Sequence, residues 1–141
     1  GKTTTSTLVS HLFTDSGEGC SAFLGGISKN YDSNLLTHTN NVIVAEADEF
    51  DRSFLQLFPE IAVITSMDAD HLDIYGDEAH IHEAFKAFAS QVSGTVIVRH
   101  GLDITEGDTK AAIMTYGYDT PASSSLHKSN KSNQHSHPCK N

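Results

Sequence analysis

The sequence predicts a three-layer α/β fold in which a mostly parallel β-sheet is flanked by helices. Three observations point to this fold. Short apolar runs rich in β-branched residues recur along the chain, stretches with apolar residues at helical spacing separate several of them, and polar residues gather where the runs end. Helices alternating with short apolar strands are typical of parallel sheets with right-handed crossovers. With 141 residues, the chain is long enough for one domain with a core.

The chain opens on Gly1, Lys2, Thr3 and Thr4, which form the closing half of the phosphate-loop motif G-x-x-x-x-G-K-[ST]. Apolar residues at helical spacing follow over residues 3–13, and a phosphate loop runs directly into such a helix, whose first N–H groups face the anion. We therefore expect a P-loop-type sheet with these four residues at the nucleotide; an ordinary capped helix is the alternative. The first half of the motif and the strand that feeds it do not occur in the sequence, so we expect a sheet truncated at its N-terminus.

The next elements are expected in the following order. A short strand is expected over residues 21–24, stopped by Gly25-Gly26, and residues 27–39 are expected to be irregular. Lys29 and Asn30 lie at a turn there; a substrate contact and a plain surface loop both remain open for them. Strands buried on both faces are expected over residues 42–45 and 61–65, joined by a short amphipathic connector that Pro59 closes.

The second half of the predicted domain repeats this alternation. A helix starts near Asp77, with Ile81, Phe85, Phe88 and Val92 on one face that packs against a sheet. Further strands are expected over residues 95–98 and 111–116. The domain is expected to span residues 1–120.

Acidic residues crowd at the ends of two predicted strands. Ten of the 18 acids of the chain fall between Glu46 and Glu78. Glu46 directly follows the strand over residues 42–45, and His71 follows the strand over residues 61–65 within a run of aspartates. Parallel strands with their carboxyl ends side by side form the crevice in which open α/β sheets bind ligands. A divalent cation would offset the repulsion, and carboxylates with an imidazole can hold Mg²⁺ beside a nucleotide. For His71, spacing alone leaves a metal ligand and a surface turn equally open.

Composition excludes several classes of protein. The net charge of −9 argues against nucleic-acid binding through a basic face. Two cysteines make no disulfide framework, and the sequence holds no apolar run long enough for a membrane span, so the cytoplasm is the expected compartment. Residues 121–141 are rich in Ser, Asn, Lys and His, and we expect a disordered tail there. Its histidines and Cys139 match no standard zinc spacing.

Three segments in this order carry a resemblance to a known family. They are GKTTT at residues 1–5, EADE at residues 46–49 after a strand, and DADHLD at residues 68–73 after the next strand. Together they resemble the central, ATP-binding domain of the Mur ligases, over roughly residues 1–118. Within that family the chain looks most like the members that add L-alanine to UDP-N-acetylmuramate in peptidoglycan synthesis. One departure is Ser66, where the family commonly has Asn.

The resemblance implies an ATP-dependent carboxylate–amine ligase with ATP and Mg²⁺ as cofactors. It implies that Lys2 neutralises the β- and γ-phosphates and that Thr3 ligates the Mg²⁺ bridging them. It further implies that Glu46 and His71 hold a second Mg²⁺, with Lys2, Glu46 and His71 as the catalytic set. Asp48, Glu49 and Asp70 are expected in supporting positions.

Three functional readings remain open at this point. One is a fragment of the alanine-adding ligase, and another is a related ligase that recycles murein tripeptide. The third is a non-catalytic P-loop module that binds nucleotide. The family also has flanking domains for the UDP-sugar and the amino acid, which this sequence does not contain. We therefore expect the 141-residue chain by itself to be inactive and to bind ATP weakly.

Overall fold

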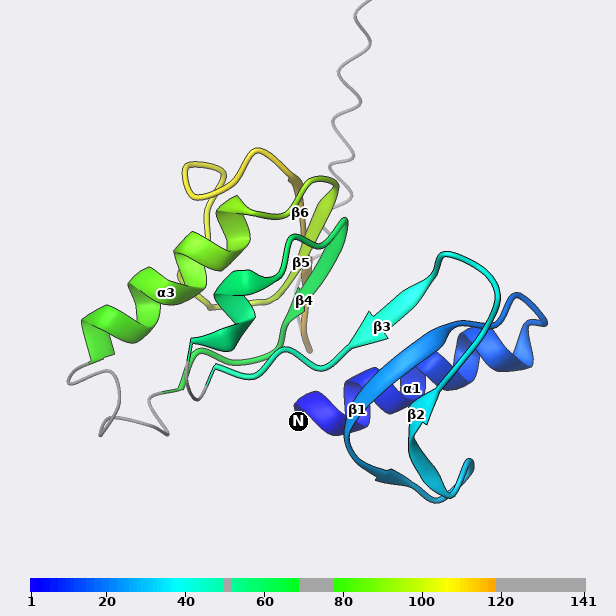
Figure 1. The fold of residues 1–141 in the computed structure, drawn as a ribbon. Coiled ribbons are helices and arrows are strands. Elements are labelled where there is room, and N and C mark those ends of the chain that lie inside the picture. Colours follow the sequence, from blue (N-terminus) through cyan, green and yellow to red (C-terminus); the bar gives the residue numbers. More distant parts are fainter. Residues whose placement is uncertain (50–51, 69–77, 119–141) are drawn as a thin grey trace, which may run out of the picture.

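The computed structural model describes residues 1–49, 52–68 and 78–118 of the chain. These described residues form two helices, a short 3₁₀ turn and six strands, whose arrangement is seen in Figure 1. The elements are α1 (Lys2–Asp15), β1 (Ser21–Ser28), β2 (Ser33–Leu36), β3 (Ile43–Ala45), η1 (Ser53–Gln56), β4 (Ile61–Ile64), α3 (Glu78–Ser90), β5 (Thr95–Arg99) and β6 (Ala112–Tyr116).

The strands form two three-stranded sheets, with the orders β2-β1-β3 and β4-β5-β6. Three of the four pairings are parallel, and only β1 with β2 is antiparallel. The predicted α/β class with mostly parallel strands is therefore confirmed. The expectation that the strands before Glu46 and before His71 are neighbours is not met among the described residues. There β3 pairs with β1 and β4 pairs with β5, and the two strands lie in separate sheets (Figure 1).

The hairpin of β1 and β2 corrects two local predictions. Strand β1 does not stop at Gly25-Gly26 but continues through both glycines to Ser28, and β2 occupies part of the segment expected to be irregular. The turn between them is closed by the N–H of Tyr31, which donates to the carbonyl of Ser28 at 3.2 Å. The pairing with β2 is irregular between Phe23 and Ser28, so the glycines lie in a distorted stretch rather than outside the strand.

Burial on both faces was predicted for β3 and β4, and this prediction is wrong. Ile43 in β3 is 66% exposed and Ile61 in β4 is 61% exposed. In β4, only Ala62 and Ile64 point into the core, where residues of α3 pack against them. Among the described elements each sheet is covered by a helix on one face, and the alternating burial follows from that.

The main core lies between α3 and the β4-β5-β6 sheet. Its buried members are Phe54, Ala62, Ile64, Met67, Ile81, Ala84, Phe88, Ala89, Val92, Val96, Val98 and Ile104. Phe54 is contributed by η1, and its ring lies 5.4 Å from the ring of Phe85 and 5.2 Å from that of Phe88 between centroids. The predicted connector therefore exists as one short turn that anchors the loop after β3 to α3.

A smaller core of Cys20, Ala22 and Leu24 lies beneath α1. The helix presents Ser6 and Ser10 to this sheet, whereas Leu8 and Leu12 are more than half exposed. The Ser10 hydroxyl donates to the carbonyl of Ser6 at 2.8 Å, so its burial leaves no donor unsatisfied. Small side chains at these positions allow α1 to approach β1 and β3 closely.

Neither described helix could cross a lipid bilayer. They contain 14 and 13 residues, and a spanning helix needs about 20 mostly apolar residues.

Candidate nucleotide-binding site

The amino end of α1 is the starting point of the site. The helix begins directly after Gly1, as the motif predicts, and the N–H of Thr5 donates to the Gly1 carbonyl at 3.2 Å. None of the described side chains caps this end, and the first turn contains no acidic residue. The first N–H groups of a helix have no acceptor within the helix and carry a positive partial charge. This end of α1 is therefore suited to an anion such as a phosphate.

Lys2 is held by two acids from the loop that follows β3. Its ammonium group donates to the Glu49 carboxylate and, at 3.5 Å, to Asp48. Burial of the lysine disfavours its charged form, but the hydrogen bond to Glu49 and the negative charges of Glu49 and Asp48 outweigh this effect. The pKa of Lys2 is consequently raised above its ordinary value. Lys2 thus stays charged, and in this structure that charge is neutralised by carboxylates.

Glu46 joins α1 to both strands of the adjoining sheet. It directly follows β3, and its backbone N–H donates to the carbonyl of Phe23 in β1 at 2.9 Å. One side-chain oxygen, Oε1, accepts a hydrogen bond from the Thr3 hydroxyl at 2.9 Å. The other, Oε2, accepts one from the backbone N–H of Gly25 at 2.8 Å. The carboxylate therefore has a fixed position beside the first turn of α1.

The structure brings Lys2, Thr3 and Glu46 together at one end of α1. These are three of the residues that the sequence predicts for the site, although Glu46 lies more than 40 positions from Lys2 and Thr3 in the chain. Thr4 is on the same helix turn and faces the neighbouring groove. His71 and Asp70 lie outside the described residues, so the predicted pairing of Glu46 with His71 stays a prediction.

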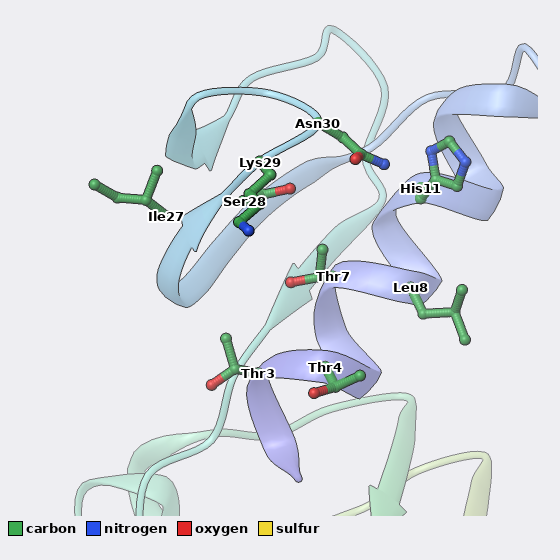
Figure 2. A pocket seen from close by; sticks show the side chains of 9 residues that line it. All are labelled: Thr3, Thr4, Thr7, Leu8, His11, Ile27, Ser28, Lys29 and Asn30. Carbon is green, nitrogen blue, oxygen red and sulfur yellow. The ribbon is translucent and has the colours of Figure 1, made fainter.

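An open groove of about 370 Å³ adjoins this cluster, between α1 and the turn that joins β1 to β2. Figure 2 shows the helix side of the groove formed by threonines and His11, with the turn opposite. Its lining residues are Thr3, Thr4, Thr7, Leu8, His11, Ile27, Ser28, Lys29 and Asn30. The Nδ1 atom of His11 lies 3.1 Å from the Tyr31 hydroxyl, and this contact ties the turn to the helix. The groove lies next to the amino end of α1, and its lining combines polar side chains with the apolar side chains of Leu8 and Ile27.

The donor set can be tested for a fit to Mg²⁺. Among the described residues, no three side chains of His, Cys, Asp or Glu converge. Mg²⁺ commonly uses one or two protein oxygens and completes its shell with water and phosphate oxygens. The Thr3 hydroxyl and Glu46 Oε1 are 2.9 Å apart. Adjacent ligands of an octahedral Mg²⁺ at metal–oxygen distances of about 2.1 Å would be about 3.0 Å apart, so these two oxygens fit one such ion.

Two residues of this network were not predicted from the sequence. Gly25 touches Glu46 through its backbone, and Ser6 lies beneath the carboxylate with its hydroxyl 3.4 Å from Oε2. A glycine inside a strand can mark a close approach of another group, which is the one signal that was present. Asp48 and Glu49 were expected in supporting positions, and they contact Lys2.

Parallel strands, a Gly-Lys-Thr-Thr helix start and acids at a neighbouring strand end define an α/β protein of the nucleotide-binding class. Within this class, the chain belongs to the family described as Mur ligase middle domain, whose sequence profile matches residues 1–140.

Relatives of known name support this assignment. The chain is 60% identical over 92 residues to a protein of Flavobacterium psychrophilum named UDP-N-acetylmuramate–L-alanine ligase. This match covers 65% of this chain and 20% of the relative. The chain is 52% identical over 106 residues to a protein of the same name from Christiangramia forsetii, covering 74% of this chain and 24% of the relative. The chain therefore spans about a quarter or less of the length of these relatives.

Two solved structures share the fold. A UDP-N-acetylmuramate–alanine ligase from Thermotoga maritima superposes with a TM-score of 0.70 at 25% identity, over 85% of this chain and 27% of that one. A ligase from Neisseria meningitides that is named for UDP-N-acetylmuramate and a tripeptide gives a TM-score of 0.71 at 22% identity, over 83% of this chain and 43% of that one. The second likeness supports the fold alone.

Proposed function

We propose that this chain is the nucleotide-binding segment of an ATP-dependent ligase that joins L-alanine to the carboxylate of UDP-N-acetylmuramate. The observation that carries the proposal is the meeting of Lys2, Thr3 and Glu46 at the start of α1. Relatives 52% and 60% identical to the chain bear the name of this activity. We place the reaction in the cytoplasm, where ATP and nucleotide-linked sugars are available.

The proposed reaction has two steps. A carboxylate oxygen of the sugar acid attacks the γ-phosphorus of ATP, the bond to ADP breaks, and an acyl phosphate forms. The amine of L-alanine then attacks the acyl carbon, loses a proton, and displaces phosphate as the amide forms. The first step brings two anions together, so positive charge at the γ-phosphate is its main requirement.

The described residues supply that charge and its placement. The first turn of α1 presents N–H groups to the phosphates, and Lys2 exchanges its contacts with Glu49 and Asp48 for phosphate oxygens. Thr3 and Glu46 would hold Mg²⁺, and in the proposal His71 joins Glu46 at a second ion. Bound Mg²⁺ neutralises phosphate charge and lets the carboxylate approach.

The groove beside α1 gives the acceptor a path to this site. Its lining begins at Thr3 and Thr4 and continues to Lys29 and Asn30 on the turn. No ion pair joins Lys29 to another described residue, so its ammonium group is available to an anionic substrate. Hydroxyl, amide and ammonium groups are the donors that a phosphorylated sugar acid requires.

A ligase for murein tripeptide is the second candidate. The relatives that are 52% and 60% identical to the chain are named for the addition of L-alanine. The alanine reading is therefore favoured.

The test is ADP release by the full-length protein that carries this chain. We expect repeated turnover, with more than one ADP formed per protein molecule, only when ATP, UDP-N-acetylmuramate and L-alanine are all present, because without L-alanine the reaction stops at the acyl phosphate. ADP release that requires the tripeptide instead of L-alanine would support the recycling ligase. Nucleotide binding without ADP release under either condition would identify a non-catalytic module and overturn the proposal.

A further inference from the structure

We propose that Gly25 is a positioning residue, whose backbone N–H fixes the Glu46 carboxylate beside Thr3. The catalytic consequence of this inference rests on the proposed function, whereas the hydrogen bond between Gly25 and Glu46 is independent of that function. The Gly25 N–H lies 2.8 Å from Oε2, while the Thr3 hydroxyl holds the other oxygen, Oε1, at 2.9 Å. The two bonds act on opposite oxygens, so together they set both the place and the rotation of the carboxylate.

The bond to Gly25 follows from where β3 ends. The parallel ladder between β1 and β3 runs from the N–H of Ser21, which donates to the carbonyl of Val42, to the N–H of Glu46, which donates to that of Phe23. A continued ladder would next join the Gly25 N–H to the backbone carbonyl of Glu46. Strand β3 stops at Ala45, and the side chain of Glu46 takes that rung instead. The carboxylate is thus fixed by the same geometry that aligns the two strands.

Position 25 has no space for a side chain. A Cβ atom there would lie 2.5 Å from Oε2 and 2.6 Å from both Cδ and Oε1 of Glu46, much closer than such atoms approach. Gly25 does not have the positive φ that favours glycine, so the reason for glycine is this contact and not the backbone conformation. The atoms that would clash belong to the end of a flexible side chain. An alanine at position 25 would therefore move the carboxylate while the strand stays in place.

Ser6 is a weaker candidate for the same role. Its hydroxyl lies 3.4 Å from Oε2 but 3.1 Å from the carbonyls of both Lys2 and Thr3. A hydroxyl has one proton to donate, and the shorter backbone contacts take it in preference. Gly25 is accordingly the group that orients Glu46 from the strand side.

The neighbouring glycine supplies a matched control. A Cβ atom at Gly26 would meet, among the described residues, the methyl group of Thr3 at 3.6 Å, which is an ordinary contact. In the full-length protein we expect Gly25→Ala to raise the Mg²⁺ concentration for half-maximal ligation at least about tenfold, as losses of ligand-orienting contacts commonly do. Gly26→Ala should leave it within about twofold, and the melting temperatures of both variants should stay close to that of the original protein.

A second readout does not depend on metal or turnover. In the 141-residue chain without nucleotide, we expect Glu46→Ala to speed amide hydrogen exchange at Gly25 at least about tenfold, because the N–H loses its acceptor. Equal exchange rates at Gly25 in the unaltered chain and in Glu46→Ala would contradict the hydrogen bond to Glu46, whether or not the protein has ligase activity. A different outcome would contradict only the positioning role. In it, the Gly25 amide exchanges more slowly in the unaltered chain than in Glu46→Ala, but Gly25→Ala needs no more Mg²⁺ than the original protein. The proposed function would then remain intact.

Discussion

At the scale of single residues, Lys2, which we propose contacts phosphate, lies against two carboxylates that favour its charged form. Its contacts with Glu49 and Asp48 raise its pKa, so the folded chain binds this proton more tightly than the unfolded chain does. A raised pKa stabilises the fold fully below the ordinary value of 10.5, and the contribution is lost as the pH rises through the higher folded value. The side chain is 39% exposed, so solvent screens the contribution, and we expect less than about 1 kcal/mol.

The substitution Lys2→Met tests this account. The melting temperature of the original chain should exceed that of the variant near neutral pH, and the difference should decrease only as the pH rises through the raised folded pKa of Lys2, above the ordinary value of 10.5. Thermal unfolding of both proteins across this pH range provides the measurement. A difference that persists unchanged at high pH would mean that packing of the lysine stem, and not its charge, stabilises the contact.

Gly101 is a residue at which conformation alone requires glycine. It has a φ of +91°, and among the described residues no atom lies within 4 Å of the place for a Cβ. We expect Gly101→Ala to lower the free energy of unfolding by about 1 kcal/mol or more, because side chains disfavour this backbone region. Gly107→Ala is the control, since its Cβ would meet Thr105 at an ordinary 3.5 Å. Equal stability of the two variants in chemical denaturation would contradict this explanation.

The sequence was informative about individual site residues where a motif or strand end marked them. Lys2 and Thr3 follow from the loop motif, and Glu46 follows from its place directly after a predicted strand. The role of Gly25 could not be predicted, since it depends on β3 ending one residue before Glu46. A side-chain carboxylate can accept the next hydrogen bond of a β-ladder only where the strand ends just before it. The exact end of a strand has no clear signal in the local sequence.

At the scale of elements, η1 illustrates how a single turn can fix a loop. Phe54 is 2% exposed and lies between Phe85 and Phe88 of α3. We expect Phe54→Ala to lower the free energy of unfolding by about 3 kcal/mol or more, because it removes a large buried ring and leaves a cavity. Phe58→Ala should change stability by less than about 0.5 kcal/mol, since Phe58 is 78% exposed. Urea denaturation of the two variants separates these outcomes, and similar losses would show that η1 is not the anchor.

Element prediction succeeded where periodicity was strong and failed where short-range signals conflicted. The spacing of Ile81, Phe85 and Phe88 located α3, and β-branched runs located β3 to β6. Strand β2 was missed because its sequence SNLL has no alternation, and it is ordered by pairing with β1. The glycines at 25 and 26 resembled a strand stop, but both lie inside β1, and Gly25 makes the close contact with Glu46 there.

At the scale of the whole molecule, the fold class followed from the order of elements, but the neighbours of each strand did not. Crossover helices imply parallel strands, and this was confirmed in three of four pairings. The division of the described strands into two sheets could not be predicted, because strand order is set by contacts between distant segments. The larger core belongs to the β4-β5-β6 sheet, so we expect that half to resist unfolding longest.

The segment 121–141 lies outside the described residues and keeps its sequence-based prediction. Its composition of Ser, Asn, Lys and His offers little apolar surface to bury. Removal of this segment should leave the melting temperature of the chain within about 1 °C of its original value. A clear decrease in melting temperature would show that the segment packs on the domain.

The most direct test of the central claim is the rate of ligation by the full-length protein with Glu46→Gln. Glutamine keeps the size of the side chain, its oxygen can accept from Gly25, and its amide group can donate to Thr3. Only the negative charge that Mg²⁺ requires is lost. We predict at least about a hundredfold lower rate with little change in melting temperature. The exposed Glu83→Gln on α3 serves as the control and should retain its rate. A rate for Glu46→Gln within about threefold of the original would contradict the account, because the charge of Glu46 would then not contribute to catalysis.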